Sequence, residues 1–88
     1  MPGATRCLQD TAGGLVQEGG QYLVTVEARL WAVVGDAVAD HGSGPHNAAT
    51  MAQGSTFVRI DGTPVVLAGH LATCGHAATG SLAIGASS

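Results

Sequence analysis

The chain has few charged residues, few aromatic residues and no lysine. Charged residues make up 10% of its 88 residues, well below the ~25% of ordinary soluble domains. Three arginines against six acidic residues give a formal net charge of −3, whereas a nucleic-acid-binding protein carries a basic patch or stripe. Phe, Trp and Tyr occur once each, fewer than we expect of a carbohydrate- or surface-binding β domain. The composition therefore argues against a nucleic-acid partner.

Long apolar runs are also absent. The longest, residues 30–34 and 64–68, fall far short of the ~20 residues that span a bilayer. The N-terminal residues lack the apolar stretch of a secretory signal. We therefore expect a protein that is made in the cytoplasm without a signal peptide and that has no stable membrane insertion. In that reducing compartment, Cys7 and Cys74 are expected to be thiols or metal ligands rather than a disulfide.

Glycine is abundant, with 14 residues, and the chain repeats itself. Residues 20–36 (GQYLVTVEARLWAVVGD) align without a gap with residues 54–70 (GSTFVRIDGTPVVLAGH), and residues 80–85 (GSLAIG) form a clipped third copy. Such repeats indicate an arrayed supersecondary unit, because a single unit cannot bury its own apolar face. We expect a single domain over residues 1–88, with pseudo-repeats at about 9–36, 36–70 and 70–88.

The repeated segments have the composition of β-strands. Their apolar residues are largely β-branched, and no helical period extends beyond two turns. Asp61-Gly62, between two apolar runs, predicts a hairpin because both central residues of a type I′ turn need positive φ. Glu27-Ala28 is the weaker counterpart, where we expect a wider turn. The prediction is an all-β fold with two hairpins and a short terminal strand, joined by loops over 1–19, 37–53 and 70–79.

The histidines and one cysteine are confined to two loops. One Cys and three His make a closed tetrahedral site suited to zinc. Gly75 between Cys74 and His76 lets the backbone fold tightly, and the Gly-Ser-Gly-Pro segment between His41 and His46 can return both imidazoles to one point. We expect one structural zinc ion held by His41, His46, Cys74 and His76, with His70 as the reserve ligand.

Two other functions compete with a purely structural role. A small zinc-dependent hydrolase would need an open coordination position for water, which four protein ligands do not leave, and the chain has no His-Glu-x-x-His motif. A stand-alone surface-binding β domain is the second alternative. We expect a protein that is not an enzyme.

Residues 54–70 resemble the repeat of the PAAR (proline-alanine-alanine-arginine) family, which runs Gly-Ser, a β run, Asn/Asp-Gly, one residue, Pro, small apolar residues and Gly-Asp. Residues 36–46 and 73–81 resemble the loops between such repeats. The name-giving tetrapeptide is degraded, to PVVL at 64–67 and LWAV at 30–33. The Gly-Asp pair is present as Gly35-Asp36, reads Gln9-Asp10 near the start and becomes Gly69-His70 in the third place. His70 therefore stands where the family has an Asp, which resembles a structural corner.

This resemblance implies a small conical β domain with pseudo-threefold symmetry, pinned by a metal ion near its vertex. Such proteins tip the spikes of type VI secretion systems, phage tails and related contractile injection particles, and help to puncture the target envelope. The implied partner is a trimeric β-helical spike (valine-glycine repeat protein G or a phage spike counterpart), with one tip, monomeric when free, for each trimer. The resemblance further implies assembly on the injection apparatus or the virion tail tip and delivery to target cells.

Overall fold

Three short antiparallel hairpins form the regular secondary structure of the computed structural model, which describes residues 2–42, 44, 48–82 and 84–86. No α-helix occurs among these residues. The described residues therefore include no helix that could span a bilayer. The predicted all-β class is confirmed. The hairpins pair β1 (Thr11–Ala12) with β2 (Gly14–Leu15), β3 (Thr25–Val26) with β4 (Arg29–Leu30), and β5 (Arg59–Ile60) with β6 (Thr63–Pro64).

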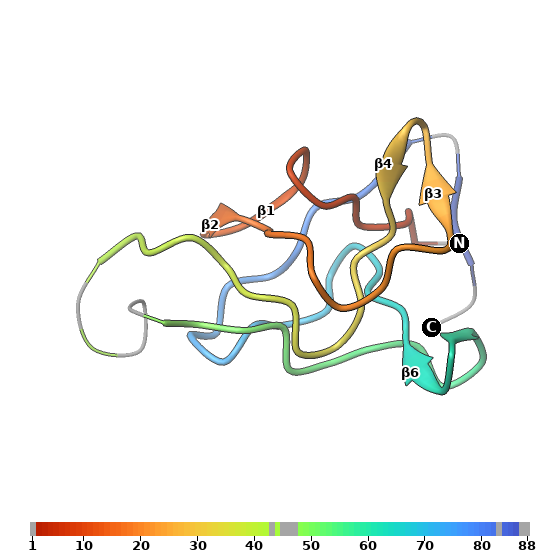
Figure 1. The fold of residues 1–88 in the computed structure, drawn as a ribbon. Helices are drawn as coiled ribbons and strands as arrows, with labels where there is room; N and C mark the ends of the chain where they lie inside the picture. Colours follow the sequence, from red (N-terminus) through yellow and green to blue (C-terminus); the bar gives the residue numbers. More distant parts are fainter. Residues whose placement is uncertain (1, 43, 45–47, 83, 87–88) are drawn as a thin grey trace.

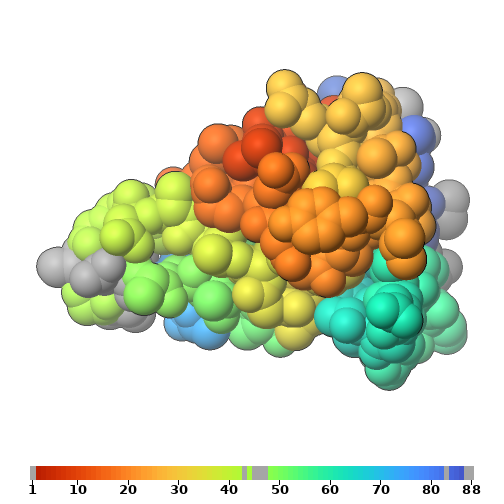
Figure 2. Space-filling view, viewed as in Figure 1, coloured from red at the N-terminus to blue at the C-terminus, as the bar shows by residue number. Residues whose placement is uncertain are grey.

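The molecule tapers along its longest axis. Its principal extents are 32 × 23 × 22 Å, and Figure 2 shows a wide end that narrows toward residues 38–42 and 48–50. The hairpins β3–β4 and β5–β6 lie at the wide end together with both ends of the described chain, whereas β1 and β2 lie nearer the narrow end (Figure 1). The domain thus has the conical outline that the family resemblance implies.

The gapless alignment of residues 20–36 with 54–70 holds in three dimensions. Thr25 pairs with Leu30 in the first copy, and Arg59 pairs with Pro64 at the aligned position of the second. The wider turn expected at Glu27-Ala28 is wrong, because both copies use a two-residue turn with positive φ at each central residue. The φ angles are 51° at Glu27, 69° at Ala28, 50° at Asp61 and 82° at Gly62.

A closed ring of backbone hydrogen bonds relates the three copies. The N–H of Thr5 donates to the carbonyl of Val66 (3.1 Å), that of Val66 to Ala32 (2.8 Å), and that of Ala32 to Thr5 (2.9 Å). Ala32 and Val66 occupy the same position in the aligned copies. Thr5 takes the third place in the ring, so the chain surrounds a pseudo-threefold axis.

The two ends of the chain together make a counterpart of the β3–β4 and β5–β6 hairpins around the axis. Gly3 bridges Gly85, and the N–H of Ala4 donates to the carbonyl of Ile84 at 2.8 Å. This bond matches those that follow the turns of the other two copies, from Trp31 to Val24 and from Val65 to Val58. The sequence predicted a terminal strand but not its partner at the N-terminus. It also missed the β1–β2 hairpin, which lies in a segment that we predicted to be a loop.

A network of polar side chains links the N-terminal and C-terminal segments of the chain, which no turn connects. The Arg6 guanidinium contacts Asp10 (2.8 Å) and Glu27 (3.0 Å), and Glu27 accepts a hydrogen bond from Ser81. Thr79 donates its hydroxyl proton to Asp10 at 2.9 Å. Burial by itself raises the pKa of Asp10, but the hydrogen bonds from Arg6 outweigh it and lower that pKa below its ordinary value.

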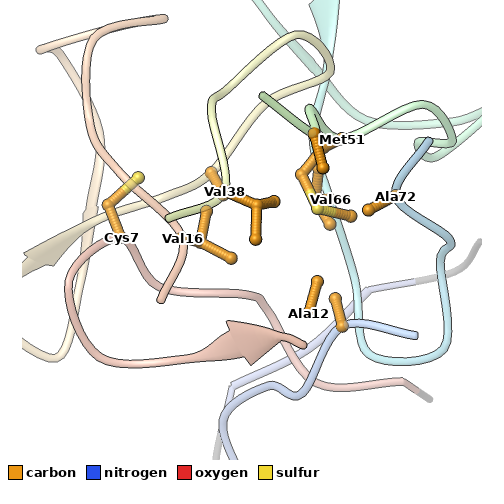
Figure 3. Packing of buried hydrophobic residues seen from close by; sticks show 10 residues of the cluster. Cys7, Ala12, Val16, Val38, Met51, Val66 and Ala72 are labelled. Atoms are coloured by element: carbon orange, nitrogen blue, oxygen red, sulfur yellow. The ribbon is translucent and has the colours of Figure 1, made fainter. Parts of the chain in front are cut away.

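Small apolar side chains fill the interior in two clusters. The cluster in Figure 3 gathers residues from distant parts of the chain: Cys7, Ala12, Val16, Ala32, Val38, Ala49, Met51, Val66, Ala72 and Ala78. The second cluster lies under the hairpins of the wide end: Ala4, Val26, Val33, Ile60, Val65 and Leu67. The buried thiol of Cys7 contacts Asp36 at 3.6 Å, and burial together with that carboxyl raises its pKa to about 12. Cys7 is therefore a core residue.

Candidate metal centre

The loops at the narrow end start at three equivalent sharp bends of the backbone, at Asp10, Asp36 and His70, which we call corners. In each corner a side chain accepts a hydrogen bond from a preceding backbone N–H: Asp10 from Arg6 (2.8 Å), Asp36 from Val33 (2.9 Å) and His70 from Leu67 (3.0 Å). The Nδ1 atom of His70 thus takes the place of a carboxylate oxygen and carries no proton. Burial lowers the pKa of His70, which favours the neutral form that this bond requires.

Each corner also closes the loop that follows it. The carbonyl of the corner residue accepts a hydrogen bond from the residue at which the loop returns: Asp10 from Val16 (3.0 Å), Asp36 from Met51 (2.9 Å) and His70 from Ala78 (2.8 Å). The three corners are therefore the starting points of three loops that run side by side. These loops differ in length and cover residues 10–16, 36–51 and 70–78. Side chains from different loops can meet between them.

His41, Cys74 and His76 meet in this way. Their ligand atoms all lie within 4.8 Å of one another. The Nε2 atom of His41 lies 3.5 Å from Sγ of Cys74 and 3.1 Å from Nδ1 of His76. A tetrahedral ion with bonds of ~2.3 Å to sulfur and ~2.0 Å to nitrogen separates S from N by about 3.5 Å and two N by about 3.3 Å. The two separations from Nε2 of His41 therefore match those of ligands around one ion, and the separation of Cys74 from His76 stays within 4.8 Å.

The orientation of the His41 ring is fixed by a backbone carbonyl. Nδ1 of His41 lies 2.9 Å from the carbonyl oxygen of Ala39, which can only accept, so Nδ1 carries the proton. The lone pair of Nε2 is then directed at Cys74 and His76. A carbonyl that holds the second nitrogen of a histidine in this way is a common partner of metal-ligating imidazoles.

The structure brings together three of the five candidate ligands. His41 and Cys74 are half-buried and His76 is exposed. His46 lies outside the described residues, so its part in the site stays a prediction. His70 is not a member of the cluster, and its Nδ1 is engaged at the corner with Leu67.

Sequence reasoning missed the contribution of Gly13 to this site. Gly13-Gly14 resembled simple loop punctuation, but a Cβ atom at Gly13 would overlap His76 and press on His41. Nothing in the sequence places the first loop beside ligands that come from the other two loops.

No pocket occurs in the surface of the described residues.

Comparison with known families gives one match. A family model described as the PAAR motif matches residues 9–78, most of the chain. That span contains the three corner residues and all members of the His41, Cys74 and His76 cluster. No curated protein matches the chain.

Proposed function

This chain belongs to the PAAR family, and we propose that it is the metal-pinned tip of a spike in a contractile injection system. Proteins of this family cap spikes of secretion or phage systems. In the proposed role, one monomeric copy sits on the end of a trimeric β-helical needle, in a type VI secretion system or a phage tail, and sharpens it for puncture of the target envelope. The proposal includes no catalytic activity.

The proposed metal centre stiffens the narrow end. We assign His41, Cys74 and His76 as ligands, with His46 as the fourth and zinc as the ion, because one thiolate and three imidazoles suit tetrahedral zinc. The ion would tie loop 36–51 to loop 70–78. Metal binding of this kind contributes roughly 10–16 kcal/mol to the folding of small zinc peptides, as much as the ~5–15 kcal/mol net stability of a typical domain.

The wide end is the proposed docking face. Large exposed apolar side chains gather in the three equivalent segments that lead into the hairpins of this end: Tyr22, Leu23 and Val24 in the first, Phe57 in the second, and Leu82 and Ile84 in the third. Leu23 and Phe57, at aligned positions, are 77% and 73% exposed. Exposed apolar side chains that gather on one end of a molecule favour an interaction site there. Burial against a partner would remove these side chains from water.

The arrangement of this apolar surface carries the proposal. The hydrogen-bonded ring of Thr5, Ala32 and Val66 places the three segments around one axis. A trimeric needle ends in three identical chains around its own axis, so one pseudo-threefold cap can present a similar surface to each. The blunt face would thus cover the open end of the needle, whose unpaired strand edges would otherwise invite other contacts.

The test is binding to a purified trimeric β-helical spike protein from the same source as this chain. Mass measurement of the complex should give one cap for three spike chains. The double variant Leu23→Asp/Phe57→Asp should weaken binding by a factor of 100 or more, because two charges would have to be desolvated in the interface (roughly 3 kcal/mol or more). Leu71→Asp is the matched control, since Leu71 is also exposed (39%) but lies in the loop 70–78.

The outcomes separate the alternatives clearly. Unchanged binding of Leu23→Asp/Phe57→Asp, or equal loss in Leu71→Asp, would show that the wide end is not the docking face. Failure of the wild-type protein to bind the spike, or a ratio of one cap for each spike chain, would contradict the role as a tip.

A further inference from the structure

We infer that the β1–β2 hairpin forms a third wall of the metal centre, and that Gly13 keeps the space between the ligand atoms open. This inference rests on the metal centre proposed above. It assigns a positioning role to the first loop, 10–16, which supplies no ligand to the cluster.

The contacts of the hairpin turn reach every member of the cluster. A Cβ atom on Gly13 would overlap Nδ1 of His76 and lie against Nε2 of His41, and these are the nitrogen atoms that face each other in the cluster. The thiol of Cys74 points at the carbonyl of Ala12, with Sγ 3.9 Å from the oxygen. The first loop therefore bounds the volume in which an ion would sit.

Gly14 leaves room for the backbone carbonyl that orients His41, and it does not border the space between the ligand atoms. A Cβ atom at Gly14 would collide with the carbonyl oxygen of Ala39 and lie 3.0 Å from Nδ1 of His41. That carbonyl and that nitrogen form the contact that orients the His41 ring. The adjacent glycines thus have separate effects: a side chain at 13 fills the ion's space, and one at 14 turns a ligand.

Backbone conformation alone does not explain the need for glycine at 13. Gly13 has a φ of 88°, close to the 95° of Gly35 and the 94° of Gly69. A Cβ atom at Gly35 or Gly69 would meet nothing within 4 Å. Alanine at any of the three positions introduces similar backbone strain. Only alanine at 13 also obstructs the cluster, so Gly69→Ala is a matched control for Gly13→Ala.

The experiment titrates zinc into metal-free protein that carries no histidine tag. Circular dichroism follows folding and cobalt substitution follows the thiolate-to-metal absorption. The zinc concentration at half-transition can be measured whether or not the metal-free protein is folded. We expect Gly69→Ala to keep a midpoint near that of the wild type and the same cobalt spectrum. Gly13→Ala should need roughly 10- to 100-fold more zinc, as changes beside metal ligands typically do, and should show an altered spectrum.

A second comparison separates obstruction of the site from damage to the hairpin. In the His41→Ala/His76→Ala background both imidazoles are gone, so Gly13→Ala should lower the melting temperature no more than Gly69→Ala does. The inference would be overturned if Gly13→Ala still lowered the melting temperature more than Gly69→Ala by the same margin in that background. The clash would then involve atoms other than the two imidazoles.

Two results of the zinc titration would contradict the inference. Gly13→Ala with the midpoint and the cobalt spectrum of Gly69→Ala would overturn the role of Gly13 while leaving the metal centre intact. A wild-type protein that binds no metal would remove the metal centre and this inference together.

Discussion

Nε2 of His41 lies 3.1 Å from Nδ1 of His76, and their ring centroids are 4.9 Å apart. The two residues belong to different loops, 36–51 and 70–78, which start from equivalent corners. Two ring nitrogens that face each other need either one shared proton or one shared cation between them. The Sγ atom of Cys74, 3.5 Å from the same Nε2, adds a third donor and favours the cation.

The two thiols should differ sharply in reactivity. Cys7 is buried and burial with Asp36 raises its pKa to about 12, so it has almost no thiolate near neutral pH. Cys74 is half-buried and belongs to the cluster of His41, Cys74 and His76. A disulfide reagent should modify neither thiol in zinc-loaded protein, Cys74 alone after chelation, and Cys7 only after denaturation. Rapid modification of Cys7 in native protein would contradict its place in the core.

Cys74→Ala should lower the melting temperature of zinc-loaded protein far more than Cys7→Ala. Removing Cys74 deletes a proposed metal ligand, whereas removing Cys7 leaves only a small cavity in the cluster of small side chains. Thermal unfolding with and without a chelator measures both effects. Equal losses in the two variants, unchanged by the chelator, would argue against a metal at Cys74.

His70→Asn should keep the corner and the metal. The Oδ1 atom of asparagine can accept the N–H of Leu67 as Nδ1 of His70 does, and His70 lies outside the cluster. The variant should bind as much zinc as the wild type. Loss of about one equivalent of zinc per chain would instead identify His70 as a ligand.

The same variant should change the pH dependence of stability. Because burial lowers the pKa of His70, its contribution is fully present above the ordinary histidine pKa of about 6.5 and is lost as the pH falls through that value toward the lower folded pKa. Between about pH 8 and about pH 5, His70→Asn should therefore lose less stability than the wild type. Denaturant unfolding at saturating zinc measures the difference, and parallel pH profiles would contradict the assignment.

Ala28→Gly should stabilise the protein. Ala28 has a φ of 69° in the turn between β3 and β4, where the second copy has Gly62 at 82°. An L-residue in this left-handed conformation loses about 1 kcal/mol relative to glycine, so the free energy of unfolding should rise by about that amount in Ala28→Gly. Gly62→Ala should lower it by a similar amount. A destabilised Ala28→Gly would show that the turn relies on the side chain of Ala28.

Arg6→Gln should weaken the closure of the chain ends. Arg6 joins Asp10 and Glu27, and its side chain is partly buried, with 18% exposed. Losing these charge-assisted bonds should lower the free energy of unfolding by about 2 kcal/mol. Arg59→Gln is the control, because within the described part of the chain the exposed Arg59 guanidinium has one hydrogen bond, of 3.4 Å, to the carbonyl of Gly62. Such surface changes stay within about 0.5 kcal/mol. Equal effects of the two changes would contradict the role of the network.

The sequence predicted features that a single repeat determines. The gapless alignment of residues 20–36 with 54–70 predicted that the two copies would form equivalent hairpins, and the Asp61-Gly62 turn was evident from its residue types. The grouping of His41, Cys74 and His76 followed from their confinement to two loops that leave equivalent corners.

Features that depend on distant parts of the chain could not be predicted. The pairing of Gly3 with Gly85 joins the two ends of the chain, and no local pattern encodes it. The tight turn at Glu27-Ala28 contradicts the residue preference, because the ring of hydrogen bonds and the buried Val26 impose the geometry of the other copy. The approach of Gly13 to His76 depends on the packing of the first loop against the third.

The most direct test of the account is the metal content of the tag-free protein. Elemental analysis after extensive dialysis should give one zinc ion per chain, and less than half an equivalent in His41→Ala and in His76→Ala. A wild-type protein with well under half an equivalent of any transition metal, and with a melting temperature that a chelator leaves unchanged, would contradict a metal-pinned tip.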